Sequence, residues 1–153
     1  MVTAEEMKKV IEKAEKEKQK VSYSVTPEEM QRFNVNDKLP YLIATKKREN
    51  DEKLGLSATA GYGKIEEMCL ISETSLKKTI NGSIRVTRTF LYKFTIGLHM
   101  SLEEANKLFE LCGGPLRETD EADYICKRYL EEPDDIHTFC NQYEKYVHKK
   151  LTR

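Results

Sequence analysis

The fold is decided by residues 65–114, which read IEEMCLISETSLKKTINGSIRVTRTFLYKFTIGLHMSLEEANKLFELCGG. Apolar residues recur in this segment at the three- and four-residue spacing of helices. Polar breaks at Ser72, Asn81-Gly82, Gly97 and Ser101 divide the pattern. Hydroxyl residues favour helix starts, and Asn-Gly favours a helix end with a left-handed backbone. The segment therefore predicts four compact helices joined by very short connections.

The pattern places these helices at residues 64–70, 73–80, 88–96 and 102–112. The second helix is short, and Lys77 and Lys78 lie away from the apolar side that Leu76 and Ile80 form. A short helix that offers basic groups from a compact helical frame is what a DNA groove can accept.

The composition predicts one hydrophilic domain with attached arms. The chain has 153 residues, of which 34% are charged and 39% apolar, and its mean hydropathy is -0.67. No run approaches the roughly 18 apolar residues of a membrane span. The charged N-terminus is unlike a secretory signal. We expect a cytoplasmic protein without membrane contact.

The four cysteines, Cys69, Cys112, Cys126 and Cys140, are far apart and lack the paired spacing of zinc ligands. His137 and Cys140 stand three apart, which we interpret as one face of a packed helix. We therefore expect no metal and no cofactor.

Catalytic motifs are incomplete. Ser75 and Lys78 match Ser-x-x-Lys without its partner motifs, and His99 is a lone histidine at a predicted helix end. We expect no enzymatic activity.

Charge is distributed unevenly although the formal net charge is +0. Residues 64–93 carry six Lys or Arg against three acids, a net of +3, and residues 94–140 carry four against eleven, a net of -7. Residues 141–153 return to +3. A basic segment beside an acidic one suits DNA binding on one side only.

The N-terminal part, residues 1–36, is predicted to be a helical arm. An apolar stripe runs through Met7, Val10, Ile11 and Ala14, which fits either a docking or dimerisation helix or a partly solvated extension. A helix start is predicted at Thr26-Pro27.

The central domain is predicted to span residues 37–114. A helix capped by Asp37 carries Leu39, Leu42 and Ile43, residues 49–53 are predicted to form a charged surface turn, and residues 57–64 a second turn. The C-terminal extension, residues 115–153, is predicted to hold two helices separated by Pro133. No segment alternates as a strand does, so the predicted class is all-α.

Residues 65–112 resemble the lambda-repressor-like helix-turn-helix family, also called the XRE family. The order and lengths of ETSLKKTINGS, RTFLYKFTIGL and SLEEANKLFELCG carry the resemblance, and the junction before Leu-Glu-Glu-Ala is similar to that of bacterial and phage members. The family usually has a small residue at the position of Glu66, Gly at that of Leu70 and an apolar residue at that of Thr79.

The resemblance implies a DNA-binding site on the second helix and its flanks. Groove-facing residues would be Glu73, Thr74, Lys77 and Lys78. Ser72 and Asn81 would lie near the DNA backbone, with Arg85 and Arg88 as phosphate contacts.

Two functions follow as hypotheses. The first is a repressor-like transcription regulator that occupies an operator in double-stranded DNA as a homodimer, with a dimer face from the N-terminal helix or from Phe139, Tyr143 and Tyr146. The alternative is a protein-binding inhibitor or adaptor of phage or mobile-element origin, similar to anti-CRISPR proteins, that keeps the frame without binding DNA. The zero net charge, the acidic segment and the departures at Glu66, Leu70 and Thr79 favour the alternative.

Overall fold

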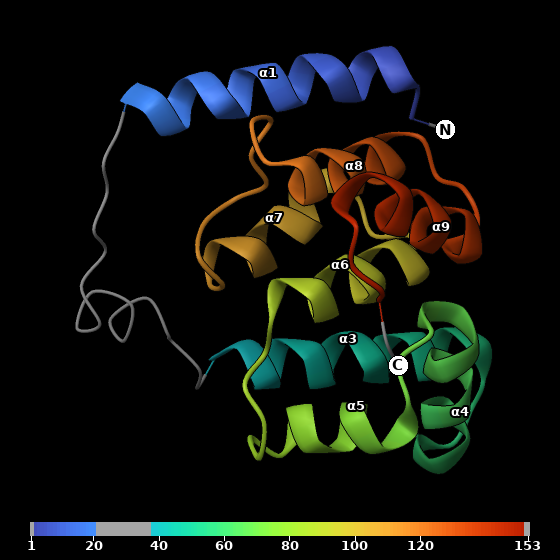
Figure 1. Cartoon of the computed structure of the whole chain (residues 1–153). Coiled ribbons are helices and arrows are strands. Elements are labelled where there is room, and N and C mark those ends of the chain that lie inside the picture. The colour runs from blue at the N-terminus through green and yellow to red at the C-terminus, as the bar shows by residue number, and fades with distance from the viewer. Residues whose placement is uncertain (1, 21–37, 152–153) are drawn as a thin grey trace.

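The computed structural model describes residues 2–20 and 38–151, and for residues 14–20 it describes the backbone only (Figure 1). The predictions at Thr26-Pro27 and Asp37 lie outside these residues. The described chain forms helices without any strand, which confirms the all-α class. The helices are α1 (Ala4–Lys20), α3 (Lys38–Leu54), α4 (Ala58–Cys69), α5 (Glu73–Ile80), α6 (Arg88–Gly97), α7 (Leu102–Glu110), α8 (Glu121–Glu131) and α9 (Ile136–Val147). None of them is long and apolar enough to cross a membrane.

Side-chain caps set the starts of these helices. An oxygen of each capping side chain accepts a hydrogen bond from a backbone N–H in the first turn, at Ser57, Ser72, Thr87, Ser101, Asp120 and Asp135. Each such cap contributes about 1 kcal/mol to helix stability. At Ser101, the side-chain Oγ accepts from Glu104 N at 3.1 Å and donates to Glu104 Oε1 at 3.2 Å. The predicted helices at 73–80, 88–96 and 102–112 are confirmed to within two residues.

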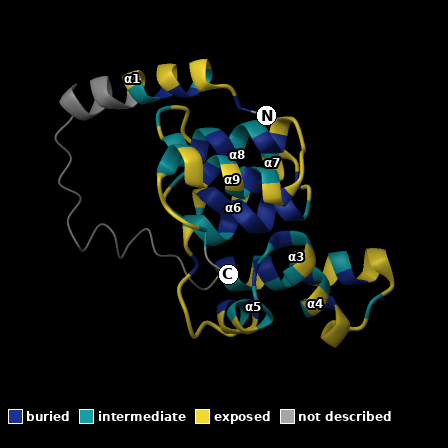
Figure 2. Ribbon diagram, turned by 45° about the vertical axis from the view of Figure 1, so that its right-hand side comes forward, coloured by how far each residue is buried: buried dark blue, intermediate teal, exposed yellow. Residues whose placement is uncertain are grey.

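The central helix is α6. Its residues Leu91–Gly97 are all buried, and it packs against α4, α7, α8 and α9 (Figure 2). A helix that is covered on every side satisfies any polar group within the protein. Thr95 does so by donating from Oγ1 to Leu91 O at 2.6 Å, and Lys93 Nζ donates to Leu70 O at 3.0 Å.

Two predicted turns are helical instead. The structure extends α3 through residues 49–53 as far as Leu54, because Lys47 and Asp51 form an ion pair at 2.6 Å along the helix and α4 covers it. Residues 58–64 form the first half of α4. Gly61 lies against the Asp51 carboxylate, where a Cβ would meet Oδ1 at 1.8 Å. This glycine therefore allows close helix packing and does not mark a turn.

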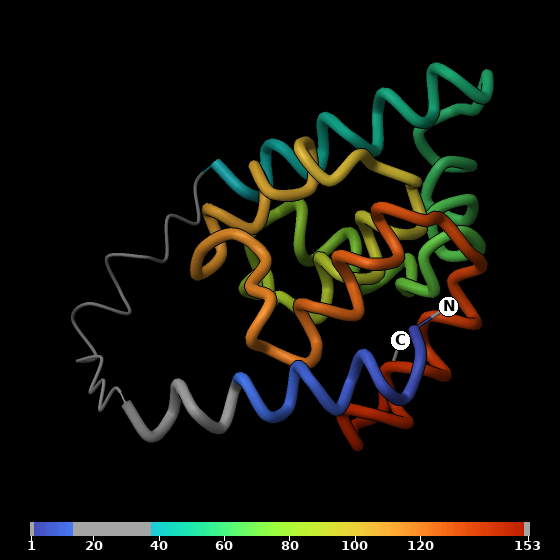
Figure 3. Tube along the Cα trace, turned by 90° about the horizontal axis from the view of Figure 1, so that it is seen from above, coloured from blue at the N-terminus to red at the C-terminus, as the bar shows by residue number. Residues whose placement is uncertain are grey.

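The arm helix α1 packs against α8 (Figure 3). It lies at the opposite end of the molecule from α5 (Figure 1). Met7 and Val10 are buried there. Val2 N donates to Gln142 Oε1, and Gln142 Nε2 donates back to Val2 O, both at 2.9 Å. Of the two readings of the apolar stripe, the structure therefore supports docking, and the docking is within the chain.

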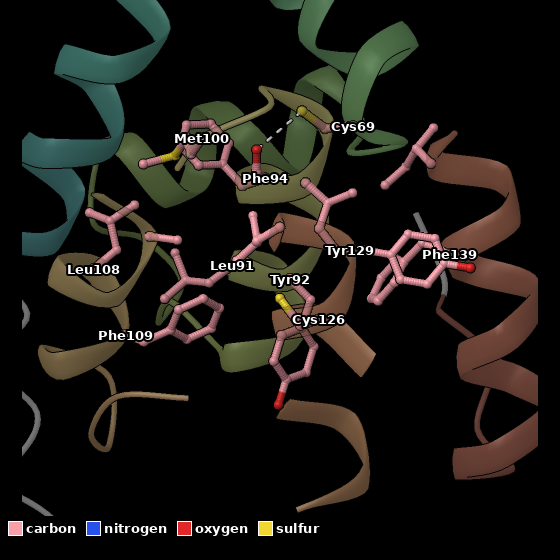
Figure 4. Close-up of a cluster of buried hydrophobic side chains, with 14 of the residues drawn as sticks. Cys69, Leu91, Tyr92, Phe94, Met100, Leu108, Phe109, Cys126, Tyr129 and Phe139 are labelled. Atoms are coloured by element: carbon pink, nitrogen blue, oxygen red, sulfur yellow. Dashed lines mark hydrogen bonds between the residues drawn. The ribbon is translucent and has the colours of Figure 1, made fainter. Parts of the chain in front are cut away.

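One hydrophobic core joins the three predicted parts of the chain. Side chains of α4, α6, α7, α8 and α9 meet in it (Figure 4). Phe139 and Tyr143, which we expected at a dimer face, are buried in this core, where Tyr143 lies 6.0 Å from the Tyr92 ring. Phe139 and Tyr143 are therefore unable to supply a dimer face while the fold is intact.

We predict that Gly97→Ala destabilises the protein by about 1–3 kcal/mol, because the new methyl group has no room. Its Cβ would lie 2.4 Å from Cys69 Sγ and 2.6 Å from Met68 O. Gly63→Ala is the matched control, since a Cβ there meets nothing within 4 Å, and it should stabilise by up to about 1 kcal/mol. Urea unfolding of both variants measures the difference, and equal stabilities would contradict the close α4–α6 packing.

Candidate nucleic-acid interface

The helices α4 and α5 are joined by a turn of three residues. Leu70 ends α4 in the left-handed conformation, with φ 57 and ψ 36, and its N–H donates to Glu66 O at 3.0 Å. Ser72 then returns to extended backbone and its Oγ accepts from Ser75 N at 3.1 Å. Glycine is the usual residue for this conformation, and a leucine adopts it at a cost of roughly 1–2 kcal/mol. The hydrogen bond from Lys93 Nζ to Leu70 O holds the turn in place.

One side of α5 is anchored in the core. Leu76 is fully buried and Thr79 is 1% exposed. The Thr79 hydroxyl donates to Ser75 O at 2.8 Å, so a polar residue is tolerated where the family usually has an apolar one. The anchored side fixes the direction in which the opposite side of α5 points.

The opposite side of α5 is polar. Thr74, Lys77 and Lys78 are exposed, and Glu73 is half-buried. Glu73 Oε1 lies 3.2 Å from Lys77 Nζ, one helical turn away. Such an exposed ion pair is worth about 0–1 kcal/mol, so it can be exchanged for another partner at little cost.

Tyr62 on α4 adds a contact that the sequence did not reveal. Its ring centroid lies 5.1 Å from Lys77 Nζ and 4.1 Å from Lys47 Nζ. The Lys47 ammonium is buried and also donates to Ala58 O at 2.9 Å. The predicted turn at residues 57–64 is wrong for Tyr62, and the helix-capping Ser57 is the signal in the sequence that indicates its place on α4.

The loop between α5 and α6 continues this surface. Gly82 has φ 81, and Asn81 Oδ1 accepts from Ser83 N at 2.9 Å. Arg85 is exposed, and so is Ile84, at 42% of its surface. Together with α5, the loop therefore presents polar, cationic and apolar groups side by side.

Arg88, at the start of α6, has a different environment. Its Nη2 lies 2.7 Å from Asp123 Oδ2, and its Nη1 donates to the carbonyl oxygens of Cys112 and Gly114 at 2.6 and 2.7 Å. Burial lowers the pKa of Arg88, but the hydrogen bond and charge of Asp123 outweigh it and raise the pKa overall. Burial, with Asp123 nearby, also raises the pKa of Tyr92, whose hydroxyl donates to that carboxylate. Arg88 is thus a structural residue of the α6–α8 contact.

The structure consequently separates the predicted residues. Those that lie on α5, at its start or in the loop that follows it are Ser72, Glu73, Thr74, Lys77, Lys78, Asn81 and Arg85. The guanidinium of Arg88 is engaged within the fold, and we leave it out of the candidate interface.

The described residues offer neither a reactive buried thiol nor a metal site. Burial raises the pKa of the Cys69 and Cys126 thiols far above their usual range, which disfavours the reactive thiolate. Within the part of the chain that the structure describes, no three His, Cys, Asp or Glu side chains are placed to hold a metal ion.

Comparison with known proteins gives no further guide. No family model matches the chain, and neither does any curated protein or solved structure. Its function is therefore inferred from its own residues.

We predict that Asp123→Ala destabilises the protein by about 3 kcal/mol or more, because it leaves the partly buried Arg88 cation without its counter-charge. Glu12→Ala, which removes an exposed carboxylate from α1, is the control and should change stability by less than about 0.5 kcal/mol. Urea unfolding compares the two, and a small effect at Asp123 would contradict the structural role of the pair.

Proposed function

We propose that the chain is a sequence-specific DNA-binding transcription regulator that occupies an operator by placing α5 in the major groove. The observation that carries the proposal is the two-sided character of α5. Leu76 and Thr79 fix one side in the core, and Thr74, Lys77 and Lys78 project from the other. A recognition helix requires this combination of rigid support and polar exposure.

The side chains suit the two kinds of contact that DNA offers. Lysine neutralises phosphates or donates to guanine, and threonine contacts base edges or the thymine methyl group. On binding, Lys77 would leave its ion pair with Glu73 and contact DNA instead. Lys78 makes no ion pair with any described residue. Glu73, once released, could accept a hydrogen bond from a cytosine amino group.

Backbone contacts would come from the two ends of α5. Arg85 in the following loop is exposed and placed for a phosphate, and Ser72 and Asn81 mark the two helix ends. Because one short helix makes few base contacts, we propose a homodimer on a roughly palindromic site, with half-sites about 34–36 Å apart.

A salt titration tests this function. We expect binding to a random double-stranded DNA pool at low salt, with affinity that falls steeply as salt rises because counterions are released. Replacing both Lys77 and Lys78 with Ala should reduce the slope of log affinity against log salt by about two. Lys9→Ala, on α1 at the far end of the molecule, should leave the slope unchanged. Absence of binding to any DNA at low salt would overturn the proposal.

The alternative is that the same frame binds a protein. The specific observation in its favour is the exposure of three large apolar side chains among the described residues, Tyr41 at 66%, Leu54 at 43% and Ile84 at 42%. A protein partner would cover them, and DNA binding would then be absent from the titration described above.

A further inference from the structure

A groove lies between α5, the loop that follows it and the start of α6. We call it the α5–α6 groove, and its volume is about 220 Å³. Ile71, Ile84 and Phe90 form its apolar part, and Arg85 and Lys93 are its charged residues. The remaining lining residues all carry hydroxyl groups. The groove therefore combines an apolar wall with hydrogen-bonding and cationic groups.

The charge of the groove is of one sign. Among the residues that the structure describes, neither Asp nor Glu lines it, and both ionisable lining residues are cations. Arg85 is exposed and makes no ion pair with any described residue. Lys93 is 4% exposed, and its Nζ donates to Leu70 O. An anion beside Arg85 would thus meet positive charge, with no Asp or Glu among the described lining residues.

The start of α6 adds to this field. Thr87 caps α6 and lines the groove, so the positive end of the helix dipole faces the same space. The apolar wall is also partly available, since Ile84 is 42% exposed and Phe90 is half-buried. A bare anion would leave that wall uncovered, whereas an anion with an apolar body would cover it.

We propose that the α5–α6 groove binds a small organic anion, which joins a carboxylate or phosphate group to a short apolar body. The anionic group lies at Arg85, and the apolar body lies against Ile84 and Phe90. The volume is below the usual 300–1,000 Å³ of drug-sized sites, which limits the ligand to a small metabolite.

The groove also touches the candidate DNA interface. Ser75 and Thr79 of α5 line it, and Arg85 is the proposed phosphate contact. A bound organic anion would occupy Arg85 and so compete with DNA. This consequence rests on the proposed function, whereas binding of the anion does not.

The test is a titration of the protein alone, followed by its backbone amide NMR signals. The probes are phenyl phosphate, benzoate and the neutral benzyl alcohol. We expect the two anions to shift the amides of residues 75–79 and 84–90 in a saturable manner, and benzyl alcohol to bind at least about tenfold more weakly for lack of a charged hydrogen bond. Equal binding of benzyl alcohol, or shifts centred elsewhere, would overturn the proposal.

Two substitutions with equal loss of charge separate the site from general attraction. Arg85→Ala should weaken both anions about tenfold or more, because it removes charge-assisted hydrogen bonds. Arg48→Ala, on α3 and outside the groove, removes an exposed arginine of the same charge and should change the affinity less than about twofold. If both variants lost the same affinity for the anions, binding would depend only on general surface charge, which would contradict the proposal.

Inorganic phosphate tests the apolar part. Ile84→Ser should weaken phenyl phosphate and leave inorganic phosphate unaffected, and the exposure of Ile84 makes the change compatible with folding. If inorganic phosphate binds as tightly as phenyl phosphate, the apolar part of the proposal is wrong. Since these titrations contain no DNA, their failure and the failure of DNA binding are independent results.

Discussion

The close contact of α4 with α6 at Gly97 is the constraint on which the placement of α5 depends. A Cβ at Gly97 would overlap Cys69 and the backbone of Met68, so only glycine lets the two helices approach this far. At the same contact the Cys69 thiol donates to Phe94 O, and Lys93 Nζ donates to Leu70 O. Because Leu70 turns the chain from α4 into α5, this contact contributes to the direction of α5, which itself packs against α3 and α4.

The other end of α6 is fixed by Arg88 and Asp123. The pair ties the first turn of α6 to α8, and the carbonyls of Cys112 and Gly114 extend the contact to the segment after α7. With both ends of α6 held, α8 and α9 become part of the core, and α1 covers them from outside. The C-terminal helices therefore support the frame that presents α5.

Interactions between neighbouring residues allowed most of the helices to be predicted from the sequence. Contacts between residues distant in the sequence account for the predictions that were wrong. Ser72, Thr87 and Ser101 mark helix starts through a hydrogen bond to their own first turn, which is visible in sequence. By contrast, Gly61 on α4 lies against Asp51 on α3. Arg88 on α6 forms an ion pair with Asp123 on α8, which is distant in the sequence. Nothing in the local pattern distinguishes these residues from turn and surface residues. The exposed side of α5 was accessible to sequence reasoning, whereas the internal role of Arg88 and the contact of Tyr62 with Lys77 were not.

The arrangement of charge gives the neutral molecule a polarity that suits one-sided binding. The helices α7 and α8 and the start of α9 lie within the acid-rich residues 94–140, and these helices lie toward the α1 end of the molecule, away from α5 (Figure 1). In the field of a polyanion such a molecule is attracted at its basic end and repelled at its acidic end. The net electrostatic force on the neutral molecule is small because its charges cancel. The uneven distribution of charge nevertheless produces a torque that turns the basic end toward the polyanion. For the proposed function, electrostatics would therefore orient α5 toward DNA more than it would hold the protein there, and affinity would depend on contacts made after orientation.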